Sequence, residues 1–302
     1  MKLVLFILIT LSSHLYAKEL NILWWNVGAN GYSDDLGDYT TLDETIASKD
    51  FSLYDVVAFG EFIENRFHGP SLDNLKKVFP YQKQLSYNKT SKQKIFILSK
   101  FPFTGVTQEI DWVDKSLNSS QINQYREEAR ILYKNRVTNF TRSYNRLTMD
   151  IAQKKYHFIF YHFNNPWPAL NEVRGKYLTA AEILLGLKNP LMHQIQNFYH
   201  ALKNDLGKRY REKNVIIMGD SNCPYSVKGL RSACIKRMRN HLPLILDHAK
   251  DYTFPSPFYR NASSHPQVKI DQAQVSDAIE KKDLEVLQWE GSDHLPIHLT
   301  VY

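Results

Sequence analysis

The sequence predicts an α+β fold, a four-layer α/β sandwich in which two packed mixed β-sheets are flanked by helices. Three observations lead to this prediction. Strand-like apolar runs recur along the chain, some apolar throughout and others alternating with polar residues, as expected for strands covered to different degrees. The stretch from about residue 94 to 163 holds several such runs and few helical ones, which argues against a parallel doubly wound sheet. No repeat or Gly/Ser linker interrupts the chain, so a single domain is expected.

The expected elements follow from periodicity and from the residues that bound each run. The runs with the composition of strands are residues 19–27, 54–59, 94–99, 130–138, 146–151, 156–163, 214–220, 268–276 and 296–302. The runs with helical periodicity are residues 41–48, 70–79, 169–187 and 190–210.

Bulk composition places the protein among globular proteins with a sizeable core. Its 302 residues are 43% hydrophobic and 23% charged, which argues against an intrinsically disordered chain. The net charge of +7 and the pI near 9.1 indicate a polyanionic partner, either nucleic acid or an anionic membrane surface. Charge says nothing about the fold.

The N-terminal residues 1–17 have the pattern of a secretory signal peptide, with one lysine, a short apolar stretch and a small residue at Ala17. A buried first strand is the weaker alternative, because residues 19–27 already form a strand-like run. The expected mature domain therefore spans residues 18–302, and the protein is expected to be secreted or periplasmic. No other apolar run is long enough to cross a bilayer, so no stable membrane anchor is expected.

Cys223 and Cys234 are the two cysteines of the chain. In an exported protein they could close a short loop with a disulfide that contributes on the order of 3 kcal/mol to stability. The alternative is a pair of free, buried thiols. Their spacing does not resemble that of a metal site.

Polar residues of similar chemistry stand at the ends of the predicted strands and in the turn before the last one. Loops at strand ends are held by a rigid scaffold and are open to solvent, which favours catalysis there. The set is rich in carboxylate and amide oxygens and has no thiolate, so it suits Mg²⁺ or Mn²⁺ better than zinc. Phosphodiester cleavage needs a cation, a positioned water and donors to the phosphate oxygens, and this set offers all three. Its members are Asn26, Glu61, His162, Asp220, Asn222, Asp271, Asp293 and His294.

Several of these residues also have a purely structural interpretation. Asn26 could satisfy backbone groups at the end of a strand, and Asp220 with Asn222 could form an ordinary Asx turn. Glu64 stands three residues after Glu61 and could be the functional carboxylate in its place.

The order of the motifs resembles the endonuclease/exonuclease/phosphatase superfamily, which has the deoxyribonuclease I-like fold. The matching pieces are WNV, GEF, IFILSKFPF, YHF, GDSN, KID and SDHLP, in that order. GDSN and SDHLP are the specific ones, and together the pieces span nearly the whole predicted mature chain. The resemblance implies a hydrolase of phosphodiester bonds, of a secreted bacterial-type nuclease branch.

The resemblance also implies a role for each residue at the strand ends. Glu61 would bind the metal, with Asn26 close by and Asp293 contributing. Asp220 would orient or deprotonate the attacking water, and Asn222 would hold a phosphate oxygen.

Two histidines complete the set that the resemblance implies. His162 would stabilise charge in the transition state, and His294 would be a second acid/base group oriented by Asp271. The sequence departs from the family pattern at two positions. Ser221 replaces the usual aromatic residue of GDFN, and Gln93 stands about where the deoxyribonuclease branch has a glutamate that pairs with the first histidine. His162 is therefore expected to lack that carboxylate partner.

The charge distribution favours DNA as the substrate, with RNA as a further candidate. Basic clusters at residues 203–214 and 228–240 flank GDSN, although each could also be an ordinary solvated face. The alternatives are a secreted sphingomyelinase or phospholipase C-like enzyme of the same fold and a non-catalytic binding protein that retains it. A membrane-acting enzyme needs an exposed apolar segment, for which residues 167–170 and 254–259 are the candidates. The protein is expected to act as a monomer.

Overall fold

The computed structural model describes residues 19–28, 39–64, 69–87, 93–109, 118–120, 123, 143–163, 190–223, 226–227, 230–243, 252–254, 267–280 and 282–302. The predicted signal peptide, the predicted strand 130–138, the predicted helix 169–187 and the apolar segment 167–170 lie outside these residues. Of the segment 254–259, the structure describes Phe254. Within the described residues, no helix combines the length and apolarity that a membrane span requires.

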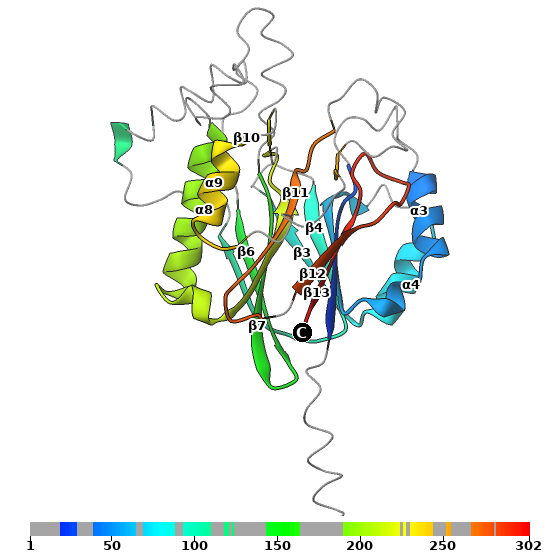
Figure 1. The fold of residues 1–302 in the computed structure, drawn as a ribbon. Helices are drawn as coiled ribbons and strands as arrows, with labels where there is room; N and C mark the ends of the chain where they lie inside the picture. Colours follow the sequence, from blue (N-terminus) through cyan, green and yellow to red (C-terminus); the bar gives the residue numbers. More distant parts are fainter. Residues whose placement is uncertain are drawn as a thin grey trace, which may run out of the picture.

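Two mixed β-sheets form the centre of the molecule (Figure 1). The six-stranded sheet has the order β12-β13-β1-β2-β4-β3 and the five-stranded sheet the order β11-β8-β7-β6-β5. Parallel pairs occur between β1 and β2 and between β7 and β8, and the other pairs in these two sheets are antiparallel. The strands of the first sheet are β1 (Leu20–Asn26), β2 (Val56–Phe62), β3 (Tyr81–Ser86), β4 (Lys94–Ser99), β12 (Lys282–Val286) and β13 (Ile297–Val301). Those of the second are β5 (Phe103–Glu109), β6 (Tyr144–Ile151), β7 (Lys154–His162), β8 (Asn214–Asp220) and β11 (Asp271–Val275).

Helices cover the outer face of each sheet, which gives the predicted four layers (Figure 1). On the outside of the six-stranded sheet lie α3 (Tyr39–Ser48), η1 (Phe51–Leu53) and α4 (Ser71–Val78). On the outside of the five-stranded sheet lie α8 (Pro190–Leu206), η3 (Tyr210–Glu212) and α9 (Ala233–Arg239). A small ribbon of β9 (Ser226–Val227) and β10 (Leu230–Arg231) precedes α9. The predicted fold class is confirmed.

The main core lies between the two sheets and follows the period of two along each strand. Ile22 and Trp24 of β1 face this core, whereas Leu23 and Trp25 face the helices on the other side. The same alternation continues to the end of β1, β7 and β8. It therefore decides which polar side chains at the strand ends point into the space between the sheets.

Several elements differ from the prediction. Strands β3, β5 and β12 and helix α9 were not predicted, because many of their residues are polar and at least partly exposed and α9 is short. The predicted helix 190–210 ends at Leu206, and Gly207 follows with φ +82°, a left-handed conformation that glycine adopts at little cost. The chain then continues as the separate turn η3.

Candidate active site

Three of the predicted site residues stand in one row across the five-stranded sheet. His162 ends β7 and is paired in register with Asp220, which ends β8. Asp220 is in turn paired with Asp271, the first residue of β11. All three are buried, and alternation turns them to the inner face, as it does Phe160 and Met218 two positions earlier. Strand register alone therefore brings two carboxylates and an imidazole together.

The six-stranded sheet supplies Asn26 and Glu61 from the opposite side. Asn26 ends β1 on the inner face, where its Nδ2 donates to Asp220 Oδ2 at 3.1 Å across the two sheets. Glu61 breaks the alternation of β2, because a β-bulge between Phe59 and Phe62 and a φ of +53° turn its side chain toward the site. Asn26 Nδ2 is 3.5 Å from Glu61 Oε1. Asn26 thus presents its amide nitrogen to the carboxylates, while its Oδ1 accepts from Gly28 N at 3.1 Å.

The turn before β13 brings Asp293 and His294 to the same place. Ser292 holds this turn, since its Oγ donates to Asn26 O at 2.6 Å and accepts from His294 N at 3.1 Å. Gly28, with φ +58°, lies directly against Asp293, and a Cβ there would collide with Oδ1 of the carboxylate. A residue without a side chain is therefore required for this close approach.

His294 is fixed by a chain of hydrogen bonds. Its Nδ1 lies 2.8 Å from Asp271 Oδ2, so the contact between these two residues expected from the sequence is present. Trp24 Nε1 donates to Asp271 Oδ1 at 3.0 Å, and Thr253 Oγ1 accepts from Asp271 N at 3.1 Å. The ring Nε2 then faces Asp220 Oδ2 at 3.9 Å. A carboxylate that holds Nδ1 fixes the orientation of the ring and leaves Nε2 for chemistry.

His162 has different surroundings. Its Nε2 lies 2.7 Å from Glu61 Oε1 and 3.5 Å from Asp220 Oδ2. Neither ring nitrogen has a well-aligned hydrogen bond among the described residues. The imidazole packs on the ring of Tyr87, with 4.9 Å between centroids. His162 thus lacks the glutamate that Gln93 replaces, as expected, but it has another carboxylate neighbour in Glu61.

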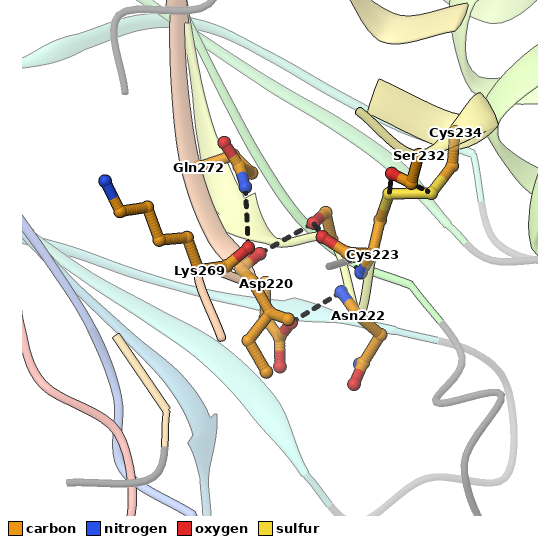
Figure 2. The surroundings of a disulfide bond; sticks show 9 residues. Asp220, Asn222, Cys223, Ser232, Cys234, Lys269 and Gln272 are labelled. Carbon is orange, nitrogen blue, oxygen red and sulfur yellow. Dashed lines mark hydrogen bonds between the residues drawn. A yellow bond between two sulfur atoms is a disulfide. The ribbon is translucent and has the colours of Figure 1, made fainter. Parts of the chain in front are cut away.

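The loop after β8 holds Asn222 beside Asp220 (Figure 2). Asn222 N donates to Asp220 Oδ1 at 2.7 Å, and Asn222 adopts φ +47°. Its Nδ2 donates to Phe163 O at 2.8 Å. Ser221, where the family pattern has an aromatic residue, is fully buried and donates to Ile270 O at 2.6 Å. Asp220 and Asn222 therefore form an Asx turn and also lie in the site. The structural and the functional interpretation of this pair are compatible.

Ionisation at the site is uneven. Burial favours the neutral acid, but the neighbouring His162 outweighs it and lowers the pKa of Glu61 to about 2. Burial, followed by the charge of Asp271, raises the pKa of Asp220 to about 6. Glu61 is therefore ionised at neutral pH, whereas Asp220 can exchange a proton near neutrality.

In the turn before β13, burial and neighbouring charges also act together on the pKa values of Asp293 and His294. Burial raises the pKa of Asp293, and the charge of Glu61 adds to the effect. Burial disfavours the charged form of His294, but Asp271 and Asp293 outweigh it and raise the imidazole pKa well above its usual value. His294 is accordingly an imidazolium held by a carboxylate.

The donor set fits a divalent metal. Ligand atoms of Glu61, His162 and Asp220 lie within 4.8 Å of one another, as do those of Asp220, Asp271 and His294. Burial raises the pKa of both Asp220 and Asp293, so a nearby cation would favour their ionised forms. A hard cation would supply that charge and would be bound by oxygen.

Sequence reasoning missed the role of Tyr87 and misjudged that of Gln93. Tyr87 OH accepts from Glu61 N at 2.5 Å, so one buried tyrosine supports both the bulge at Glu61 and the ring of His162. Gln93 Nε2 donates to Glu61 Oε2 at 2.9 Å. Nothing in the local pattern around Tyr87 indicated this role, because the contacts join residues far apart in the chain.

The two cysteines form a disulfide between Cys223, directly after Asn222, and Cys234 in the first turn of α9 (Figure 2). Ser232 Oγ lies 3.3 Å from each sulfur. The bond ties the loop of Asp220 and Asn222 to the helical layer outside the sheet.

The sequence matches the Endonuclease/Exonuclease/phosphatase family over residues 23–294. None of the curated proteins matches the chain in sequence. Similar solved structures include truncated Caenorhabditis elegans TDP2 (14% identity, 95% of this chain and 99% of that chain, TM-score 0.61). Others are SmcL (15%, 95% and 100%, TM-score 0.63) and the mannosyl-6-phosphatase Bt3783 of Bacteroides thetaiotaomicron VPI-5482 (14%, 94% and 99%, TM-score 0.61). At these identities the structures share the fold.

Proposed function

The chain belongs to the endonuclease/exonuclease/phosphatase family, whose members hydrolyse phosphoester bonds, and we propose that it is an exported, Mg²⁺-dependent phosphodiesterase that cleaves DNA. RNA is a further candidate substrate. The observation that carries the proposal is the convergence of β1, β7 and the turn before β13 on Asp220 Oδ2 at the end of β8. This atom lies 3.1 Å from Asn26 Nδ2, 3.5 Å from His162 Nε2 and 3.9 Å from His294 Nε2.

The residues around this atom can carry out hydrolysis of a phosphodiester. Asp220 orients the attacking water and accepts its proton at Oδ2, for which a pKa of about 6 is well placed. His294 donates from Nε2 to a phosphate oxygen while Asp271 holds Nδ1. His162 stabilises charge on the transition state from the other side. Asn222 uses one N–H of its amide on Phe163 O and has a second for a phosphate oxygen.

The metal would be held by Glu61, with Asp293 and Asn26 beside it. Glu61 is ionised at neutral pH, and Gln93 orients it. Asn26 can coordinate through its oxygen only after its amide turns over, because Nδ2 faces the carboxylates. When bound, the cation supplies positive charge to the phosphate oxygens.

The charge of the protein supports nucleic acid as the substrate. The net charge is +7, and exposed cations stand close together in the stretch 203–213 and on α9: Lys203, Lys208, Arg209, Arg211, Lys213, Lys236 and Arg237. Lysine and arginine contacts to phosphates dominate nucleic-acid affinity. The disulfide supports export, because such bonds persist in oxidising compartments. We further propose that the protein acts as a monomer.

Incubation with plasmid DNA, RNA and sphingomyelin, each with Mg²⁺ and with chelator, tests the proposal. We expect Mg²⁺-dependent cleavage of DNA. Cleavage of sphingomyelin alone would replace the proposal with the phospholipase C-like alternative. Binding of DNA without cleavage of any of the substrates would favour the non-catalytic alternative.

A further inference from the structure

Helix α9 is attached to the catalytic loop by a covalent bond. Cys234 in its first turn is joined to Cys223, which follows Asn222 directly (Figure 2). One face of the helix is buried through Ile235 and Met238. The beginning of α9 is therefore held at a fixed position relative to the loop that carries Asp220.

The other end of α9 is held as firmly. Arg211 of η3 donates to His241 O at 2.7 Å and to Asn240 O at 3.0 Å, which satisfies carbonyls at the end of the helix. Gln274 of β11 donates to Met238 O and Leu242 O, at 3.2 and 2.7 Å. A short helix with both ends fixed presents its outward side chains with little freedom of the backbone.

The outward face of α9 is basic. Lys236 and Arg237 are exposed, and the sequence ACIKRMR contains no acid. Neither cation has a carboxylate partner within the part of the chain that the structure describes. Arg209 of the neighbouring turn is a contrast, because Glu212 pairs with it. Among the described residues, no carboxylate neutralises the positive charge of Lys236 and Arg237 on α9.

Cations from three elements meet at the end of α9, around His241. The ring of His241 stacks on Tyr199 of α8, with 4.1 Å between centroids. Burial, followed by the charges of Arg237, His200, Arg211 and Lys203, lowers the imidazole pKa to about 4. These cations thus lie close enough to oppose one more positive charge.

We propose that the exposed face of α9, with Lys236 and Arg237 at its centre and Lys203 of α8 beside it, binds the phosphate backbone of nucleic acid outside the reacting centre. This inference rests on the proposed function and assigns a second contact surface to the same substrate. The disulfide fixes the distance between this surface, which we call the α9 surface, and Asn222.

Nucleic acid fits the α9 surface better than an anionic membrane does. The exposed large hydrophobic residues of the described chain are Leu53, Val78, Tyr81, Val106 and Tyr302, and none of them lies on α8, η3 or α9. Membrane-binding surfaces combine basic residues with apolar ones that enter the lipid. A phosphate backbone requires the cations alone.

The position of α9 sets the length of substrate that it can reach. Arg237 is three residues after Cys234, or about 4.5 Å along a helix axis. Phosphates of one strand advance by about 3.4 Å per nucleotide along the duplex. The α9 surface can thus contact phosphates within a few nucleotides of the cleaved bond, whereas a substrate without flanking nucleotides cannot reach it.

The test uses the full-length exported protein with Lys236→Ala and Arg237→Ala combined. The control combines Lys76→Ala and Lys77→Ala on α4, which removes the same charge on the other side of the molecule (Figure 1). KM and kcat are measured with a dinucleotide, which has no flanking phosphates, and with a duplex of about 30 base pairs. The salt dependence of KM for the duplex is measured as well, and a small synthetic phosphodiester reports on the reacting centre of the parent.

In the parent, we expect a lower KM for the duplex than for the dinucleotide. In the α9 variant, most of this difference in KM should disappear while kcat stays close to the parent value. The slope of log KM against log salt concentration should decrease by about one per removed cation. Equal effects in the α4 control, or no change of KM in the α9 variant, would overturn the inference and leave the proposed function intact. A parent that hydrolyses the small phosphodiester but not DNA would instead refute DNA as the substrate. Binding of parent and α9 variant to anionic phospholipid vesicles is measured in parallel, and a variant that loses vesicle binding while its KM for DNA is unchanged would assign the surface to membranes and overturn the inference.

Discussion

His294 and His162 face the same carboxylate, Asp220, but the protein supports them in different ways. His294 is held by Asp271, which is itself fixed by Trp24 Nε1 at 3.0 Å. His162 has no such support, and the nearest carboxylate oxygen belongs to Glu61, at 2.7 Å. One imidazole is thus oriented by residues of the scaffold, and the other lies against the residue that we expect to bind the metal.

The difference between the two histidines shows which part of the site is preorganised. The half around His294 is complete within the chain itself, because each partner is buried and hydrogen-bonded. The half around His162 contains a close contact with Glu61 but no aligned hydrogen bond at the ring. Metal binding at Glu61 should therefore change the surroundings of His162 and leave His294 in place.

The largest expected effect concerns the preorganised half. His294→Ala should lower kcat by roughly 10²- to 10⁴-fold, the usual contribution of an acid/base group. Asp271→Asn should cost less, and the double variant should be scarcely worse than His294→Ala, because members of one catalytic unit are not additive. The measurement is a double-mutant cycle on kcat at saturating Mg²⁺, with His298→Ala as control. If the two losses multiply, Asp271 and His294 do not act as a pair.

A second prediction addresses the metal-dependent half. Glu61→Gln should reduce activity and apparent metal affinity by at least the roughly 10- to 100-fold that loss of an outer-shell partner costs. Glu64→Gln, three residues on and exposed, is the matched control and also tests whether the sequence pattern named the right carboxylate. Activity is titrated with Mg²⁺, and thermal melts with chelator check folding. Equal losses in both variants would contradict the assignment.

Tyr87→Phe should have a smaller effect, of roughly 10-fold on apparent metal affinity. The change removes the oxygen that accepts from Glu61 N and retains the ring under His162. It leaves a buried N–H unsatisfied, which costs about 1–3 kcal/mol of stability. Tyr156→Phe, on the same strand as His162, is the control. A loss of stability with an unchanged Mg²⁺ requirement would mean that Tyr87 supports only the fold.

The smallest expected effect concerns His157, a buried histidine of β7 outside the site. Burial and then Arg146 lower its pKa to about 4. The folded state therefore prefers the neutral ring, so the associated stability is complete above about 6.5 and is lost as pH falls toward 4. His294 has the opposite sign, because its raised pKa gives stability that is present below about 6.5 and lost at higher pH.

The measurement is the midpoint of thermal unfolding between pH 7 and pH 4.5. His157→Asn, which keeps an acceptor for Thr148 and Arg146, should reduce the dependence on pH over this range. An unchanged dependence would show that other groups set the acid sensitivity.

Local pattern determined which side chains could belong to the site. Buried runs such as residues 214–220 are long enough to be strands, and alternation fixes the face of Asp220 and His162 once the strands are known. The fold class followed from the same runs. Strands with many exposed polar residues, such as β3, gave no comparable signal, since their pairing is stabilised by neighbouring strands and not by burial of their own side chains.

Tertiary structure decided the distances between the site residues and the contacts that hold these residues in place. The side chain of Glu61 points into the site because of a β-bulge in β2 and a hydrogen bond from Glu61 N to Tyr87 OH. No local sequence pattern predicts either feature. The position of α9 depends on a disulfide and on Arg211, which meet the helix from different parts of the chain. The sequence by itself determined the residue types and the order of the strands that carry them, because hydrophobic periodicity is local. Register, bulges and long-range hydrogen bonds arise only when the sheets pack, and they turned those residues into one site.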